Sequence, residues 1–125
     1  NNVENDEDFD NFLREWLKLY INKQNFTFVF DTTNVTNVPL KYSVRMTTFI
    51  KDLKNNNEIH YLQKSIILVN NSFVKRMLSF IFKIQSPVAP VYITDNKSDI
   101  DLLLTNQVID NVICIMPGNS FMPFL

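Results

Sequence analysis

The chain has 125 residues, 46% hydrophobic and 20% charged, with a formal net charge of −1, which predicts one globular domain spanning residues 1–125 whose core needs no disulfide. The near-balance of basic and acidic residues argues against nucleic acid as a partner, and no apolar run reaches the roughly 18–20 residues of a membrane span. The acidic first residues are unlike a signal peptide, and the lone Cys114, inside an apolar run, indicates a buried thiol and a reducing, cytoplasmic setting.

The N-terminal part of the chain predicts a helix and then a strand. Apolar residues recur at i, i+3, i+4, i+7, i+8 and i+11 over residues 7–22, after Asn5 or Asp6 as a cap, which is the pattern of an amphipathic helix. In Phe26–Asp31, phenylalanine alternates with threonine and valine, and all three residue types favour a strand.

The following segment predicts a second helix. Pro39 suits the first position of a helix, and apolar residues line one face of Leu40–Lys54. The run Asn55-Asn56-Asn57 ends this helix, and Glu58–Gln63 is expected to form a short helical turn.

The centre of the chain predicts a strand, a turn and a third helix. The continuous apolar run Ile66–Val69, within a strand expected over Ser65–Asn70, is typical of a strand buried on both faces. Ser72 is the expected N-cap of a helix over Phe73–Ile84, whose basic residues Lys75, Arg76 and Lys83 we interpret as a solvated face.

The C-terminal part completes the pattern. Two further strands are predicted at Val91–Thr94 and Val112–Met116, with a short helix over Ile100–Leu104 between them. Helices and strands therefore alternate along the whole chain. This order predicts an α/β fold, a three-layer sandwich with a mainly parallel sheet of about four strands and helices on both faces.

Several enzyme classes lack their motifs in this sequence. Gly118 is the only glycine, so the glycine-rich phosphate loops of nucleotide- and dinucleotide-binding proteins and the nucleophile elbow of hydrolases are absent. His60 is the only histidine, and we interpret it as a packing residue. We therefore expect a protein that is not an enzyme and that has no cofactor and no metal site.

One alternative remains open for Asp31 and Asp95. Both follow predicted strands, and the carboxyl ends of parallel strands meet at one edge of a sheet, where ligands gather. Two carboxylates there could hold a cation or accept a phosphoryl group, whereas the simpler interpretation is that each aspartate caps a loop.

The third predicted helix carries more apolar residues than one sheet face can cover. Phe80 and Phe82 are two positions apart and point about 200° away from each other, so one of them must meet another helix, the C-terminal tail or another molecule. We predict that this helix and the tail form a binding surface for a protein partner, a lipid or a larger assembly. Its expected residues are Phe73, Met77, Phe80, Ile81, Phe82, Phe121 and Phe124.

Three segments together resemble the CRAL-TRIO, or Sec14-like, lipid-binding family. They are FTFVFD at 26–31, LQKSIILVNNSFV at 62–74, where Val69-Asn70 match the family's "VN" and Phe73 its aromatic residue, and DNKSDIDLLL at 95–104. The BCH-type protein-interaction module is similar in the last segment. This resemblance covers about residues 26–104 and implies a non-enzymatic module for lipid binding or protein interaction.

The departures from that pattern favour protein interaction. The family's proline after "VN" is Ser72 here, and its glycine after the first aspartate is Asn34. The opening strand, which in the family helps to wall the lipid pocket, is missing.

A regulatory STAS domain is the alternative resemblance. Residues 31–54 align with it without gaps, and LVNNSFVKRML at 68–78 is similar to its pattern. In STAS regulators a phosphorylated serine follows the second turn. Leu40 occupies that position here and has no hydroxyl, and Ser43 is the nearest serine.

Overall fold

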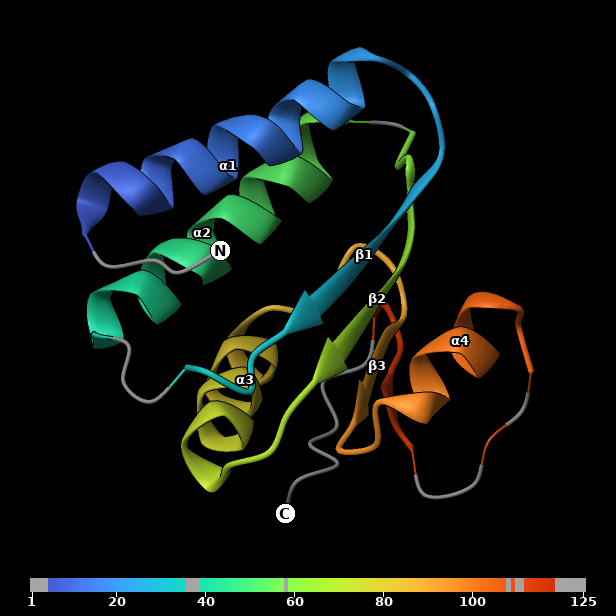
Figure 1. Cartoon of the computed structure of the whole chain (residues 1–125). Helices are drawn as coiled ribbons and strands as arrows, with labels where there is room; N and C mark the ends of the chain where they lie inside the picture. The colour runs from blue at the N-terminus through green and yellow to red at the C-terminus, as the bar shows by residue number, and fades with distance from the viewer. Residues whose placement is uncertain (1–4, 36–38, 58, 108, 110–111, 119–125) are drawn as a thin grey trace.

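The structure, a computed structural model, describes residues 5–35, 39–57, 59–107, 109 and 112–118. Helices and strands alternate along this part of the chain (Figure 1). In chain order they are α1 (Asp6–Ile21), β1 (Phe26–Asp31), α2 (Leu40–Asn56), β2 (Leu62–Leu68), α3 (Ser72–Ile84), β3 (Val91–Thr94), α4 (Ser98–Leu104) and β4 (Ile113–Ile115).

The strands form one sheet in the order β1-β2-β3-β4. The first three are parallel, and β4 runs antiparallel to β3. Helices α1, α2 and α3 cover one face of the sheet, and α4 lies on the other (Figure 1). The predicted α/β fold, with a mainly parallel four-stranded sheet between helices, is confirmed.

The core lies mainly between the sheet and the first three helices. Ile67 of β2 and Val69, which directly follows this strand, pack against the buried side of α3. Closer to the N-terminus, Trp16 and Tyr20 of α1 pack with Leu53 and Leu62. As predicted, the central strand is buried on both faces, because Ile66 and Leu68, which point the other way, are buried too.

Some predicted boundaries are wrong. Leu62 and Gln63 belong to β2 and not to a helical turn, because the strand begins early to pair with β1, where the Phe26 N–H donates to the Tyr61 carbonyl at 2.9 Å. The N-cap of α3 is Asn71 instead of Ser72, since the Asn71 side chain accepts from the Val74 N–H at 2.9 Å. Helix α1 begins after Asn5, one of the two expected caps.

Candidate binding surface

Helix α3 has one side in the core. Val74, Leu78, Ile81 and Phe82 are its buried residues, and all four belong to the main core cluster. Phe82 is only 7% exposed. Of the two phenylalanines that were predicted to point in different directions, Phe82 is therefore the one that faces the core.

A second apolar stripe runs along one flank of α3. It consists of Phe73, Met77, Phe80 and Ile84, at positions i, i+4, i+7 and i+11, which share one side of a helix. Phe73 and Met77 are half-buried against the core, whereas Phe80 and Ile84 are 36% and 60% exposed. The stripe is therefore half-buried at the start of α3 and exposed at its end.

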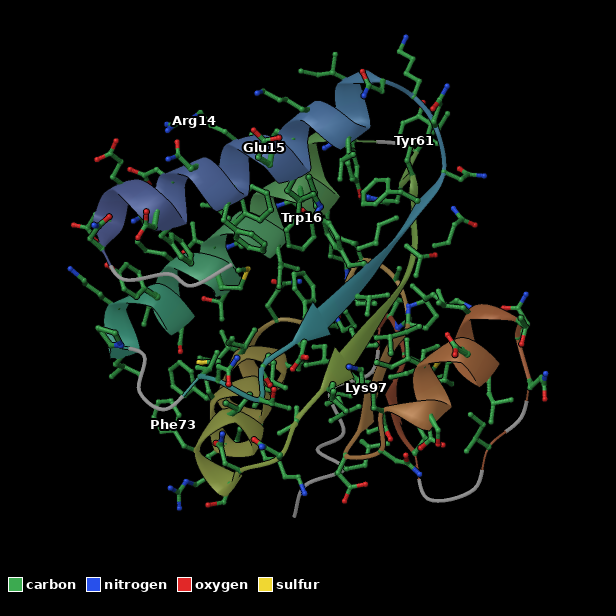
Figure 2. All side chains as sticks on the ribbon, viewed as in Figure 1. Arg14, Glu15, Trp16, Tyr61, Phe73 and Lys97 are labelled. Atoms are coloured by element: carbon green, nitrogen blue, oxygen red, sulfur yellow. The ribbon has the colours of Figure 1, made fainter. Side chains whose placement is uncertain are left out.

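This flank of α3 faces α2. The two helices pack against each other, and Figure 2 shows Phe73 on the side of α3 that is turned toward α2. The Lys54 ammonium, near the end of α2, donates to the Ser86 hydroxyl, just beyond α3, at 2.7 Å.

Two exposed apolar residues of α2 lie on the flank of that helix that is turned toward α3. Leu40, Val44 and Thr47 share one flank of α2 with Lys54, because their spacing of i, i+4, i+7 and i+14 keeps them on one side of the helix. That flank is turned toward α3, as the Lys54 contact shows. We define the α2–α3 surface as Leu40, Val44, Phe73, Met77, Phe80 and Ile84.

The helices that carry this surface are strongly basic. They hold seven cationic side chains and one carboxylate, Asp52, and so have six net positive charges in a chain whose net charge is −1. The cations are Lys41, Arg45, Lys51, Lys54, Lys75, Arg76 and Lys83.

Only two of these cations are ion-paired within the described part of the chain. Lys41 pairs with Asp6 of α1 at 3.1 Å, and Arg45 pairs with Asp10 of the same helix. These pairs hold the pKa of the Asp6 carboxyl below its ordinary value and raise that of the Arg45 guanidinium. The other five cations leave the α2–α3 surface with a positive field.

The predicted binding residues divide into three groups. Phe73, Met77 and Phe80 lie on the α2–α3 surface, whereas Ile81 and Phe82 are core residues that cannot contact a partner directly. Phe121 and Phe124 lie outside the described residues. A Phe82→Asp change would place a carboxylate in the core and is therefore expected to destabilise the fold.

Three surface residues were not among those predicted. Ile84 shares the helical periodicity of Phe73 and Phe80, and this spacing could have identified it. Leu40 and Val44 gave no such signal, since their exposure follows from the way α2 is turned against α3.

Asp31 acts as a loop cap. Its carboxylate accepts from the Thr33 N–H at 3.0 Å and from the Thr33 hydroxyl at 2.6 Å, and these bonds lower the pKa of Asp31. Asp95 is exposed. Among the described residues, no group of three or more His, Cys, Asp or Glu side chains is placed to hold a metal ion.

His60 has a defined neighbour. Its Nδ1 lies 2.9 Å from the Tyr20 hydroxyl. Burial, with a smaller contribution from Lys54, lowers the pKa of His60, and burial raises the pKa of Tyr20 to about 12. Both side chains are therefore neutral at pH 7, which agrees with the packing role predicted for His60.

Cys114 is exposed, so its predicted burial is wrong. The alternation of β4 turns Ile113 and Ile115 toward the main core and Cys114 toward the face that carries α4. There Cys114 borders a cavity of about 250 Å³, which is lined also by Lys64, Tyr92, Leu103, Asn106, Gln107, Ile109 and Val112. Although the side chain is exposed, the neighbouring residues partly desolvate the thiol and raise its pKa, so it stays protonated at neutral pH.

Comparisons of the chain with protein-family models, with curated proteins and with solved structures each return no match. In the part of the chain that the structure describes, no helix has the length and apolar character needed to cross a membrane.

Proposed function

We propose that this protein is a non-enzymatic, Sec14-like interaction module that binds a protein partner through the α2–α3 surface. One observation carries the proposal: Phe80 and Ile84 are exposed on helices that hold six net positive charges. The sequence resemblance to the CRAL-TRIO and BCH-type modules supports the same class of function.

Both the apolar and the charged groups of the α2–α3 surface favour association with a partner. Covering exposed apolar side chains contributes roughly 25 cal/mol for each Å² removed from water, which favours association. Cations around such a patch select partners of opposite charge and speed their encounter. A partner segment with acidic and apolar side chains therefore fits this surface best.

Lipid binding is the second candidate. The combination of basic and apolar side chains on α3 also suits an anionic lipid headgroup. The cavity beside Cys114, at about 250 Å³, is smaller than the roughly 300–1,000 Å³ typical of ligand pockets, so this cavity offers little room for an enclosed lipid. Protein interaction is therefore the first choice.

The STAS-like alternative has less support still. Ser43, the serine nearest to the aligned phosphorylation position, is 4% exposed and faces the core side of α2. A kinase could not reach its hydroxyl without local unfolding. Leu40 at the aligned position offers no hydroxyl.

Site-specific photo-crosslinking in cells tests the protein-partner proposal. A photoreactive phenylalanine analogue at Phe80 should give a defined protein adduct, and this adduct should disappear when Arg76→Glu and Lys83→Glu reverse the local charge. The matched control is the same analogue at Leu102 of α4, which is 37% exposed against 36% for Phe80. Equal adducts at both positions, or none at Phe80, would contradict the proposal.

Native mass spectrometry of the purified protein separates the two candidates. Under the first proposal the protein should carry no lipid. A lipid bound at one equivalent would reverse the order and make lipid binding the favoured function.

A further inference from the structure

Helix α3 carries exposed apolar side chains next to cations that form no described ion pair, and the two together indicate what binds there. We propose that the α2–α3 surface binds an amphipathic helix of a partner protein, whose first turns are acidic and which runs antiparallel to α2 and α3. The inference rests on the proposed function, because it concerns the same surface, and it adds the kind of segment that binds and its direction.

The apolar contact lies along one side of α3. Phe73, Met77, Phe80 and Ile84 share this side of the helix, and the exposed fraction is highest near its end, at 36% for Phe80 and 60% for Ile84. At 1.5 Å per residue, these four residues span roughly 16 Å of the helix axis. A partner helix of about three turns, with apolar side chains at i, i+4, i+7 and i+11, matches this length.

A helix fits this surface better than an extended segment. The backbone groups within α2 and α3 are paired inside each helix, so the surface presents side chains and not a strand edge. An extended segment laid across it would shield its own N–H and C=O groups from water without pairing them, which costs free energy. A bound helix pairs these groups internally and contributes its side chains to the contact.

Two exposed cations of α3 flank Phe80. Arg76 precedes Phe80 by four positions and Lys83 follows it by three, so both lie beside it on the helix surface. Neither forms an ion pair with a described residue, and α3 itself contains no carboxylate. Carboxylates on a bound helix would therefore meet unpaired cations directly beside the apolar contact.

Most of the unpaired positive charge lies where α2 and α3 end. The two helices run parallel to each other, because each connects two parallel strands of the sheet. The Lys54 ammonium donates to the Ser86 hydroxyl at 2.7 Å, so the end of α2 lies beside the end of α3. Lys51, Lys54 and Lys83 all belong to the last two turns of their helices, and none has an ion-pair partner among the described residues. This end of the surface therefore attracts acidic groups most strongly.

The position of these cations sets the direction of the bound helix. Acidic side chains are most favourable in the first turn of a helix, where they complement the partial positive charge of its N-terminus. A bound helix whose acidic first turn lies beside Lys54 and Lys83 would satisfy both its own dipole and these cations. Its C-terminus would then point toward the start of α3, so that it runs antiparallel to α2 and α3.

A synthetic amphipathic peptide of about sixteen residues tests the kind of segment. It has leucine at i, i+4, i+7 and i+11 and glutamate only in its first two turns. Fluorescence anisotropy should show saturable binding, and the amide resonances of Phe80, Lys83 and Ile84 should shift in the ¹⁵N-labelled protein. A peptide with the same composition but with glutamate only in its last two turns should bind at least about fivefold more weakly. A proline at the centre of the first peptide, which breaks its helix, should weaken binding at least about tenfold.

Lys83→Glu and Lys75→Glu are the matched variants. Both reverse one charge of α3 at an exposed position, so neither should unfold the protein, which circular dichroism checks. Lys75 is two positions from Phe73, about 200° around the helix, and points away from the apolar stripe. Lys83→Glu should therefore weaken binding of the glutamate-first peptide at least about tenfold, whereas Lys75→Glu should change it less than about threefold.

A nitroxide spin label on the first residue of the peptide reports the direction. It should broaden the amide resonances of Lys83 and Ile84 more than those of Ser72 and Phe73, which lie at the start of α3. Stronger broadening at the start of α3, no saturable binding, or an equal loss of binding in Lys75→Glu and Lys83→Glu would each overturn the inference.

Photo-crosslinking at Phe80 in cells does not depend on these peptides. A defined protein adduct at Phe80 without peptide binding would retain the proposed function and reject the acidic helix as the bound segment. The absence of an adduct would reject the proposed function itself. Failure of the proposed function and failure of this inference are therefore distinguishable.

Discussion

Phe82 and Phe80 provide a quantitative test of how α3 is oriented. Phe82 is 7% exposed and belongs to the main core cluster, whereas Phe80 is 36% exposed. Truncating a buried phenylalanine to alanine costs roughly 3–5 kcal/mol, from lost transfer free energy and the cavity left behind. Because domains of this kind have only about 5–15 kcal/mol of stability, Phe82→Ala should remove a large fraction of it.

Urea unfolding measures this difference. Trp16, the only tryptophan, contacts the rings of Phe28 and Phe49 at 4.7 and 5.0 Å, so its fluorescence reports on the core. With a slope of about 1–3 kcal/mol/M, Phe82→Ala should lower the midpoint by more than about 1 M. Phe80→Ala should cost less than about 1 kcal/mol. The reverse order would mean that α3 is rotated by about half a turn, which would refute the assigned surface.

Three further measurements test other parts of the structure. Asn71→Ala should cost about 1 kcal/mol of unfolding free energy as a lost N-cap, whereas Ser72→Ala should be nearly neutral; equal costs would contradict the assigned cap. Ile67→Ala should cost roughly 2–5 kcal/mol, since Ile67 lies in the core, and a cost below about 1 kcal/mol would argue against its burial. The lowered pKa of His60 means that the unfolded chain binds its proton more tightly, so stability should fall as the pH drops below about 6.5. His60→Gln should remove this part of the pH dependence, and an unchanged thermal-unfolding profile between pH 7 and 5 would contradict the assignment.

Elements with a strong local pattern were predictable from the sequence. Phe26–Asp31 and Val91–Thr94 have the predicted bounds, because alternation and β-branched residues define a strand without reference to its neighbours. Leu62 and Gln63 carry no such pattern. They are extended because they lie beside the start of β1, and that pairing depends on residues far away in the sequence.

The N-cap residue of α3 was not predictable from the sequence, for a different reason. Asn71 and Ser72 both have side chains that favour the N-cap position, so composition does not separate them. The structure selects Asn71, whose amide also donates to the Val35 carbonyl at 3.0 Å. A contact with the loop after β1 therefore contributes to placing the cap, and no local rule contains it.

The proposed binding surface was predictable only in part. The sequence shows that Phe80 and Phe82 diverge, but the direction of the sheet decides which one is buried. In the same way, the exposure of Leu40 and Val44 cannot be predicted until the flank of α2 that faces α3 is known. Periodicity gives the angle between side chains, and the packing of the neighbouring element gives the orientation.

The distribution of charge explains why composition was a poor guide to partners. A net charge of −1 suggests a surface without a strong field. The fold instead separates the charges, because α1 carries three net negative charges while α2 and α3 together carry six net positive ones. Asp6 and Asp10 neutralise cations only where α1 meets α2. A positive field therefore remains on the α2–α3 surface, where five cations have no ion-pair partner among the described residues, and this field can select a partner within about one Debye length.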